Sequence, residues 1–168
     1  MKNNIEIERK YIIEMPNRES LLALPFSDSS SILQIYLESD IGVTHRIRSR
    51  EYKDGVRFFE TVKRRIDKIS AFEDEKEITE AEFREKSRKI RKGSKPLSKE
   101  RITFPYEEYL IEIDIYPEWK STAIMEIELK SHSEAPKVPD FIKIIKEVTG
   151  EKKYTNSSLA EQFPPEEK

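Results

Sequence analysis

Charged side chains recur in this sequence at a spacing of two, and rows of this kind could bind ions. Near the start of the chain, Glu6, Glu8 and Lys10 alternate with Ile5 and Ile7. Successive side chains of a β-strand point to opposite faces, so the two carboxylates and the ammonium would share one face. Hard divalent cations prefer oxygen ligands, and a phosphate accepts hydrogen bonds from an ammonium group. A single row of this kind is also typical of a solvated sheet face, so its meaning depends on the rest of the chain.

The same alternation returns in most of the strand-like segments, and the rows are separated by sign. Acidic rows occur at four places along the chain and basic rows at three, each with aliphatic or aromatic residues on the opposite face. After the first row, the chain contains Arg46 and Arg48, Lys63, Glu73 and Glu75, Lys99 and Arg101, Glu112 and Asp114, and Glu126 and Glu128.

Length and composition limit the class of protein. The 168 residues are expected to form one domain, 1–168, which is long enough to bury a core. Lys and Arg number 31 against 33 Asp and Glu, and this balance argues against a nucleic-acid partner. There is no cysteine, which excludes disulfides, thiolate metal sites and a cysteine nucleophile. We find no transmembrane run and no signal-peptide core, and expect a cytoplasmic monomer or homodimer without a membrane partner.

Hydrophobic periodicity and turn signals predict an α+β fold with eight strands. The expected helices are at 16–22, 79–92, 139–149 and 158–163, and the helix at 139–149 is expected to bury Phe141, Ile144, Ile145 and Val148. The expected strands are at 4–13, 32–37, 43–51, 56–63, 71–78, 97–104, 108–116 and 124–131.

The pattern admits two arrangements of these strands. If the sheet closes with its aliphatic face outward beneath the helices, the charged rows line an interior that can hold one small ligand. Such an interior suits a polyanion held by Arg and Lys, with a divalent metal ion held by Glu. If the sheet stays flat, the charged face is exposed to water. The alternation alone does not decide between the two.

A basic segment from Arg84 to Lys92 is the other feature that could carry a function. It could form a nucleic-acid patch, but it lacks the interleaved aromatic residues on which bases stack. A solvated helix face is therefore the favoured interpretation.

The order of the motifs resembles the CYTH superfamily, the triphosphate tunnel metalloenzymes. The N-terminal E-x-E-x-K signature corresponds to Glu6, Glu8 and Lys10, and the matching elements span almost the whole chain. Two positions depart from the usual pattern, because Ala71 stands where an Arg is often found and Lys153 where Arg is common. The further matches are Tyr36-Leu37, Arg46-Ile47-Arg48, Lys63, Glu73-Asp74-Glu75, Lys99-Glu100-Arg101, Glu112-Ile113-Asp114, Glu126-Ile127-Glu128, Val148-Thr149 and Lys153-Tyr154-Thr155-Asn156.

The resemblance implies a closed eight-stranded antiparallel β-barrel, or tunnel, with a charged lumen and helices packed outside. It also implies binding of a triphosphate compound together with Mg²⁺ or Mn²⁺. The N-terminal signature and the Lys-Tyr-x-Asn tail are most similar to the short bacterial branch that hydrolyses inorganic tripolyphosphate to pyrophosphate and phosphate. The alternatives are a class IV adenylate cyclase, a thiamine or nucleoside triphosphatase, and a non-catalytic module that binds polyanions or RNA.

Carried over residue by residue, the resemblance implies a catalytic set and two sets of ligands. Arg50 and Glu77 extend the rows but are expected at the solvated mouth, and Tyr36 could either hydrogen-bond in the tunnel or pack. The catalytic set is Glu6, Glu8, Lys10, Glu73 and Glu75. The phosphate-binding set is Lys10, Tyr36, Arg46, Arg48, Lys63, Lys99, Arg101 and one or both of Lys152 and Lys153. The metal-binding set is Glu6, Glu8, Glu73, Glu75, Asp114, Glu126 and Glu128.

Overall fold

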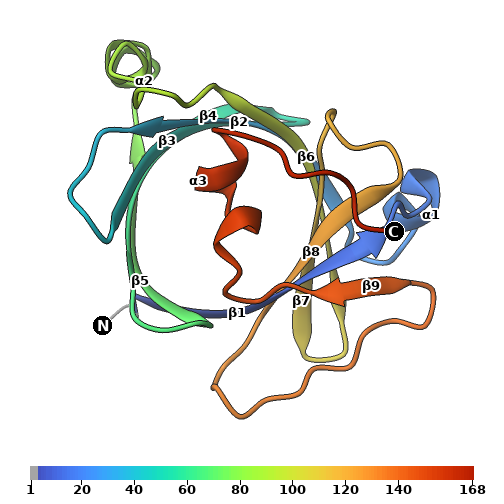
Figure 1. Ribbon diagram of the computed structural model, residues 1–168. Helices are drawn as coiled ribbons and strands as arrows, with labels where there is room; N and C mark the ends of the chain where they lie inside the picture. Colours follow the sequence, from blue (N-terminus) through green and yellow to red (C-terminus); the bar gives the residue numbers. More distant parts are fainter. Residues whose placement is uncertain (1–3) are drawn as a thin grey trace.

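A closed antiparallel barrel of eight strands dominates the computed structural model, which describes residues 4–168 (Figure 1). The barrel closes because β1 pairs with β8 along most of its length and with β5 at its start. This confirms the tunnel fold predicted from the sequence. The strands of the barrel are β1 (Ile5–Glu14), β2 (Asp28–Leu37), β3 (Val43–Tyr52), β4 (Gly55–Arg65), β5 (Ser70–Ile78), β6 (Leu97–Tyr106), β7 (Tyr109–Ile115) and β8 (Thr122–Glu128).

Alternation along the strands directs the charged rows inward and most of the aliphatic residues outward. On β1, Tyr11 and Ile13 are buried in an outer core, whereas Lys10 faces Glu126 of β8 across the lumen wall. The outer core continues over β6, β7 and β8, where Ile113 and Met125 are among the fully buried side chains. The hydrophobic effect thus acts on the outer face of the sheet and leaves the inner face polar.

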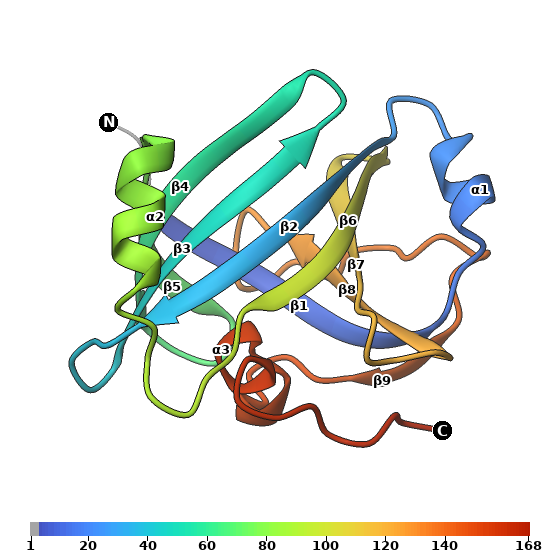
Figure 2. The same cartoon turned by 90° about the horizontal axis from the view of Figure 1, so that it is seen from above.

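Helices cover little of the barrel. The helix α1 (Arg18–Leu22) is capped by Asn17, and α2 (Glu80–Ser87) begins with a capping box formed by Thr79 and Glu82, as the sequence predicts. The helix α2 lies on the outside of the barrel (Figure 2). Its Phe83 packs in a cluster with Ile35 and Leu37 of β2 and Ile47 of β3. Within residues 4–168, none of the helices is both long and apolar enough to cross a membrane.

The predicted helix at 139–149 is wrong, because this segment contains a short strand, β9 (Ile144–Glu147). Of the four residues expected to be buried, Val148 is buried and Ile145 is partly buried, whereas Phe141 and Ile144 are exposed. The physical reason lies in β1, which pairs with β5 only over residues 5–7. Beyond that point its edge would be open, and β9 supplies hydrogen-bond partners to residues 11–13 of β1.

The sequence analysis expects all helices outside the barrel, but the C-terminal segment departs from this expectation. A single 3₁₀ turn, η1 (Lys152–Tyr154), leads into α3 (Asn156–Leu159), which lies across one end of the tunnel (Figure 2). An apolar cluster that includes Tyr116, Trp119 and Tyr154 fills that end beneath α3. The chain then runs outward, where the indole nitrogen of Trp119 donates to the carbonyl of Pro164 at 3.1 Å.

One carboxylate on the outer face joins α2 to the sheet. Glu60 of β4 is buried, its Oε1 lies 2.7 Å from His45 Nε2, and it accepts a hydrogen bond from Lys86 of α2 at 2.9 Å. Lys76 of β5 lies 3.2 Å from its other oxygen. Burial acts to raise the pKa of Glu60, but the hydrogen bonds from these three partners outweigh it and lower the pKa to about 2.

We predict that Glu60→Gln lowers the free energy of unfolding at pH 7 by about 2 kcal/mol. Because the folded-state pKa is depressed, the charge stabilises the protein fully above the unfolded-state pKa and loses its effect as the pH falls toward 2. Urea denaturation of both proteins between pH 7 and pH 3 should show a difference that shrinks with acidification. Glu77→Gln, which breaks an exposed pair with Arg57, is the matched control and should change little. A difference independent of pH would contradict the assignment.

Candidate active site

The inner faces of the strands enclose a polar cavity of about 420 Å³. Most residues of the predicted site line it, and α3 contributes its floor. The predicted residues that line the cavity are Glu6, Glu8, Lys10, Tyr36, Arg46, Arg48, Lys63, Glu73, Arg101, Glu126 and Lys152.

The basic wall of the cavity comes from β3. The side chain of Arg46 has no hydrogen bond to any described residue, and its nearest carboxylate, Glu73, is 3.9 Å away. Arg48 donates one hydrogen bond to Glu75 at 3.1 Å and keeps its Nε without a partner among residues 4–168. Burial, followed by the adjacent charge of Arg46, lowers the pKa of Arg48 to about 10. This pair of guanidinium groups therefore has N–H donors ready for an anion.

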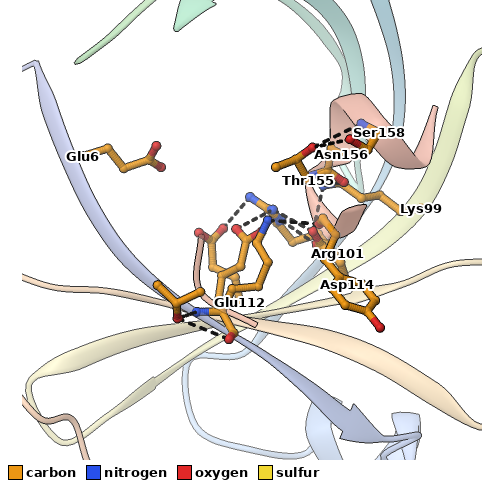
Figure 3. Close-up of polar contacts among 12 residues, drawn as sticks. Glu6, Lys99, Arg101, Glu112, Asp114, Thr155, Asn156 and Ser158 are labelled. Carbon is orange, nitrogen blue, oxygen red and sulfur yellow. Dashed lines mark hydrogen bonds and ion pairs between the residues drawn. The ribbon is translucent and has the colours of Figure 1, made fainter. Parts of the chain in front are cut away.

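The acidic wall comes from β1 and β8, and its carboxylates already have cationic partners. Lys63 donates to Glu6 at 2.7 Å and lies 3.7 Å from Glu73. Lys10 lies 3.2 Å from Glu126. Figure 3 shows Glu6 extending into the lumen from β1.

Glu8 is the exception within this wall. It is the partner of Glu128 in the antiparallel register between β1 and β8, and Glu126 is also close to it. Burial raises the pKa of Glu8 to about 8, and the negative charge of Glu126 adds to the effect. The charges of Lys10 and Lys63 act in the opposite direction but do not outweigh burial. This carboxyl therefore holds a proton at neutral pH when no cation is bound beside it.

A dense network of ion pairs fills the wall between the cavity and the end of the tunnel that α3 covers (Figure 3). Arg101 donates through Nε and Nη2 to the two oxygens of Asp114, both at 2.8 Å, and through Nη1 to Glu112 at 2.7 Å. Lys99 donates to Asp114 at 2.7 Å. These groups lie within a few ångströms of one another, so each charge is compensated by a direct hydrogen bond.

Five predicted site residues do not line the cavity. Lys99 and Asp114 are buried behind Arg101, and Glu75 is engaged by Arg48 and Thr61. Glu128 is exposed, and the ammonium of Lys153 lies over the ring of Tyr154 and 3.9 Å from Glu167. Their predicted roles in binding stay predictions.

Several lining residues lie outside the predicted set. Arg50 lines the cavity and donates to Ser30, although the sequence analysis expects it at the solvated mouth. Arg65 extends the row of Thr61 and Lys63 at the same spacing, so the alternation of β4 could have revealed it. No comparable signal exists for the residues of the tail, because their position depends on the path of an irregular segment. These are Thr155, Asn156, Ser157 and Ser158.

The donor set of the cavity fits a hard divalent cation such as Mg²⁺. Glu6, Glu8 and Glu126 present carboxylate oxygens to the lumen, and oxygen is the ligand that these cations prefer. Within residues 4–168, no three acidic or histidine side chains are already gathered as a metal cluster. Mg²⁺ usually needs only one or two carboxylates, with water and substrate oxygens completing its coordination. The residues of the acidic wall would therefore hold such an ion together with an anionic ligand.

Comparisons with known proteins support the fold. No family model and no curated protein sequence matches the chain. Among solved structures, the inorganic triphosphatase NE1496 aligns over 95% of this chain and 97% of its own, with a TM-score of 0.58 and 23% identity. A conserved hypothetical protein from Pyrococcus furiosus aligns over 76% of this chain and 80% of its own (TM-score 0.57, 18% identity). A putative adenylyl cyclase from Hippeastrum aligns over 74% and 80% (TM-score 0.51, 15% identity). The chain shares its tunnel fold with these structures.

The raised pKa of Glu8 leads to a prediction about stability. In the unfolded chain this carboxyl ionises near its usual pKa, whereas in the folded protein it stays protonated up to about pH 8. Its contribution to stability therefore falls as the pH rises through this window. In metal-depleted buffer, Glu8→Gln should raise the free energy of unfolding at pH 7.5 by about 2 kcal/mol, with a smaller gain at pH 5.

Urea denaturation at pH 5, 6.5 and 8 measures this effect. Glu14→Gln, an exposed substitution on the same strand, is the control and should show no such trend. A destabilised Glu8→Gln protein at pH 8 would show that Glu8 is ionised and well paired in the folded state.

Proposed function

We propose that this protein is a divalent-cation-dependent triphosphatase that hydrolyses inorganic tripolyphosphate to pyrophosphate and phosphate. The observation that carries the proposal is the cavity, in which the free N–H groups of Arg46 and Arg48 face a row of carboxylates. An enclosed site with separate basic and acidic walls suits a polyanion and a cation together. The name of the structural neighbour NE1496, an inorganic triphosphatase of the same fold, supports this choice.

The phosphate chain would be bound from the basic wall. Arg46 and Arg48 offer donors in a planar arrangement that matches two phosphate oxygens at once. Lys63 of β4 and Lys10 of β1 also line the cavity and supply further positive charge to the same space. Arg50, Arg65 and Lys152 line the cavity as well, which leaves its cations in excess over its acids.

The acidic wall would hold the cation through Glu6, Glu8 and Glu126. A bound Mg²⁺ or Mn²⁺ supplies neutralisation of charge on the phosphate oxygens and a lowered pKa for a bound water. Glu73 lies on the same side of the cavity as Glu6, and burial raises its pKa. A carboxylate of raised pKa is a stronger base toward the attacking water.

The reaction then follows from positioning. The oxygen of a water forms a bond to the terminal phosphorus while the bond from that phosphorus to the bridging oxygen breaks. The proton of the water passes to Glu73, and the electron pair of the broken bond stays on pyrophosphate. The arginines hold the chain in line, and the closed barrel limits the access of other water molecules to the reacting atoms.

A linear inorganic substrate fits the lining better than a nucleotide. Tyr36 is the one aromatic side chain among the described residues that line the cavity, and the guanidinium of Arg91 lies 5.3 Å from the centre of its ring. The cavity therefore offers no open aromatic face on which an adenine could stack. An adenylate cyclase would need an adenine-binding pocket in addition to the residues that bind the phosphates.

We predict that the protein releases phosphate and pyrophosphate from tripolyphosphate with Mg²⁺ or Mn²⁺, and that a chelator abolishes the reaction. Glu6→Ala should lower kcat by about 100-fold or more, because it removes a carboxylate from the cation site. Glu14→Ala on the same strand is the control. Parallel assays with ATP and thiamine triphosphate, in which phosphate, pyrophosphate and cyclic AMP are followed, test the other activities. Cyclic AMP from ATP would favour the cyclase, and metal-dependent activity retained by Glu6→Ala would exclude this site.

A binding experiment tests the basic wall without turnover. Arg46→Met should raise the Kd of tripolyphosphate for the metal-depleted protein about tenfold or more, because it removes charge-assisted hydrogen bonds. Arg57→Met, at an exposed ion pair, is the matched control. Isothermal titration calorimetry measures both. Equal affinities for the two variants would show that the anion binds elsewhere.

A further inference from the structure

Two neighbouring basic residues of β6 have different environments. Lys99 and Arg101 lie on the same face of the strand, yet only Arg101 lines the cavity. The side chain of Lys99 has 0% of its surface exposed, and its ammonium lies beside Asp114. A residue so enclosed cannot contact a ligand in the cavity without a rearrangement of its neighbours.

The three donors of the Lys99 ammonium are already accounted for. One hydrogen bond goes to Asp114 at 2.7 Å and a second to the side-chain oxygen of Asn156 at 3.4 Å. The ring of Tyr116 lies 5.9 Å from the ammonium and provides a cation–π contact on the remaining side. The ammonium is therefore enclosed by groups of the protein itself.

Each partner of Lys99 fixes a different part of the site. Asp114 holds Arg101 through two parallel hydrogen bonds and thereby sets the direction of its guanidinium. Asn156 is the first residue of α3 and lines the cavity floor. It also accepts a hydrogen bond from the hydroxyl of Tyr116 at 2.6 Å. Lys99 and Asp114 thus connect the wall of the cavity to its floor (Figure 3).

We propose that Lys99 and Asp114 are positioning residues: Asp114 orients Arg101, and Lys99 fixes α3 through Asn156, so that neither contacts the substrate. This inference concerns residues outside the basic wall that would bind the phosphates. It rests on the proposed function only in its choice of tripolyphosphate as the anion. The pair keeps α3 docked over one end of the tunnel, a segment whose other polar anchors include the hydrogen bonds from Arg91 to Ser157.

The variant Lys99→Met separates this role from direct binding, with Lys63→Met as the matched substitution inside the cavity. Lys99→Met leaves Asp114 paired with Arg101, so the fold is retained and circular dichroism should show this. Hydrogen exchange reports on the amides of α3 and the turn after it, among them Leu159 and Ala160, which donate to Thr155 and Asn156. We expect these amides to exchange about fivefold faster in Lys99→Met and at an unchanged rate in Lys63→Met.

The affinity of the metal-depleted proteins for tripolyphosphate should respond in the opposite way, falling more in Lys63→Met than in Lys99→Met. Lys63→Met removes the cationic partner of Glu6 and one of two cations near Glu73, so more negative charge would oppose the anion. It should raise the Kd about tenfold or more, whereas Lys99→Met should change it less than about threefold. A large loss of affinity in Lys99→Met with unchanged exchange in α3 would overturn the proposal. If the wild-type protein bound no tripolyphosphate, the proposed function would fail, while the exchange data would still test the positioning role.

A double-mutant cycle provides a second test. Asn156→Ala removes the same contact from the side of α3, so the exchange rates in Lys99→Met/Asn156→Ala should not exceed those in Asn156→Ala alone. Independent, multiplicative effects would show that Lys99 does not act through Asn156 and would also overturn the proposal.

Discussion

The structure depends on charges of both signs being enclosed by one closed sheet. An unpaired charge in such a lumen is costly, and removal of one partner of a buried pair typically costs about 3–5 kcal/mol. Near the end of the tunnel that α3 covers, the described cations form ion pairs with carboxylates, as Arg101 does with Asp114 and Glu112. Arg46 does not, because its nearest carboxylate is 3.9 Å away. Pairing is thus nearly complete on one side of the lumen and incomplete on the other, and the incomplete side is where an anion can bind.

The aliphatic outer face is the counterpart of this polar interior. An apolar core covers the outer face of the barrel over β1, β6, β7 and β8. The usual arrangement of a small barrel is therefore inverted. Apolar packing is concentrated in this outer layer and in the cluster around Tyr116, Trp119 and Tyr154 at one end of the tunnel. The charged residues of the inner face are left available for function. Buried titratable groups such as Glu8 reduce stability in return, as residues in binding sites often do.

The sequence could predict what depends on alternation and little of what depends on the path of irregular segments. A one-residue shift of a strand would exchange its two faces, so alternation predicted that Glu6 shares a face with Glu8 and Arg46 with Arg48. That these faces point into a closed lumen was implied by the family resemblance. The same rule failed to separate Lys99 from Arg101, because which of the two reaches the cavity depends on where α3 covers the lumen. The strand β9 was also missed. Its residues are compatible with a helical pattern, and the need for it arises from the edge of β1, which is a property of the assembled sheet.

Filling of the cavity by a polyanion requires ion pairs to exchange partners. Arg46 can bind an anion at once, but Lys63 is engaged with Glu6 at 2.7 Å. If a phosphate takes Lys63 away, the carboxylate of Glu6 is left uncompensated in a buried site, which opposes the exchange. A second positive charge beside Glu6 removes that penalty and releases the lysine for the phosphate. Anion and cation must then raise each other's affinity by the same factor, since such coupling is reciprocal. The internal ion pairs of the tunnel thus support the proposed dependence on a divalent cation, in addition to the part that we propose for the ion in the chemical step.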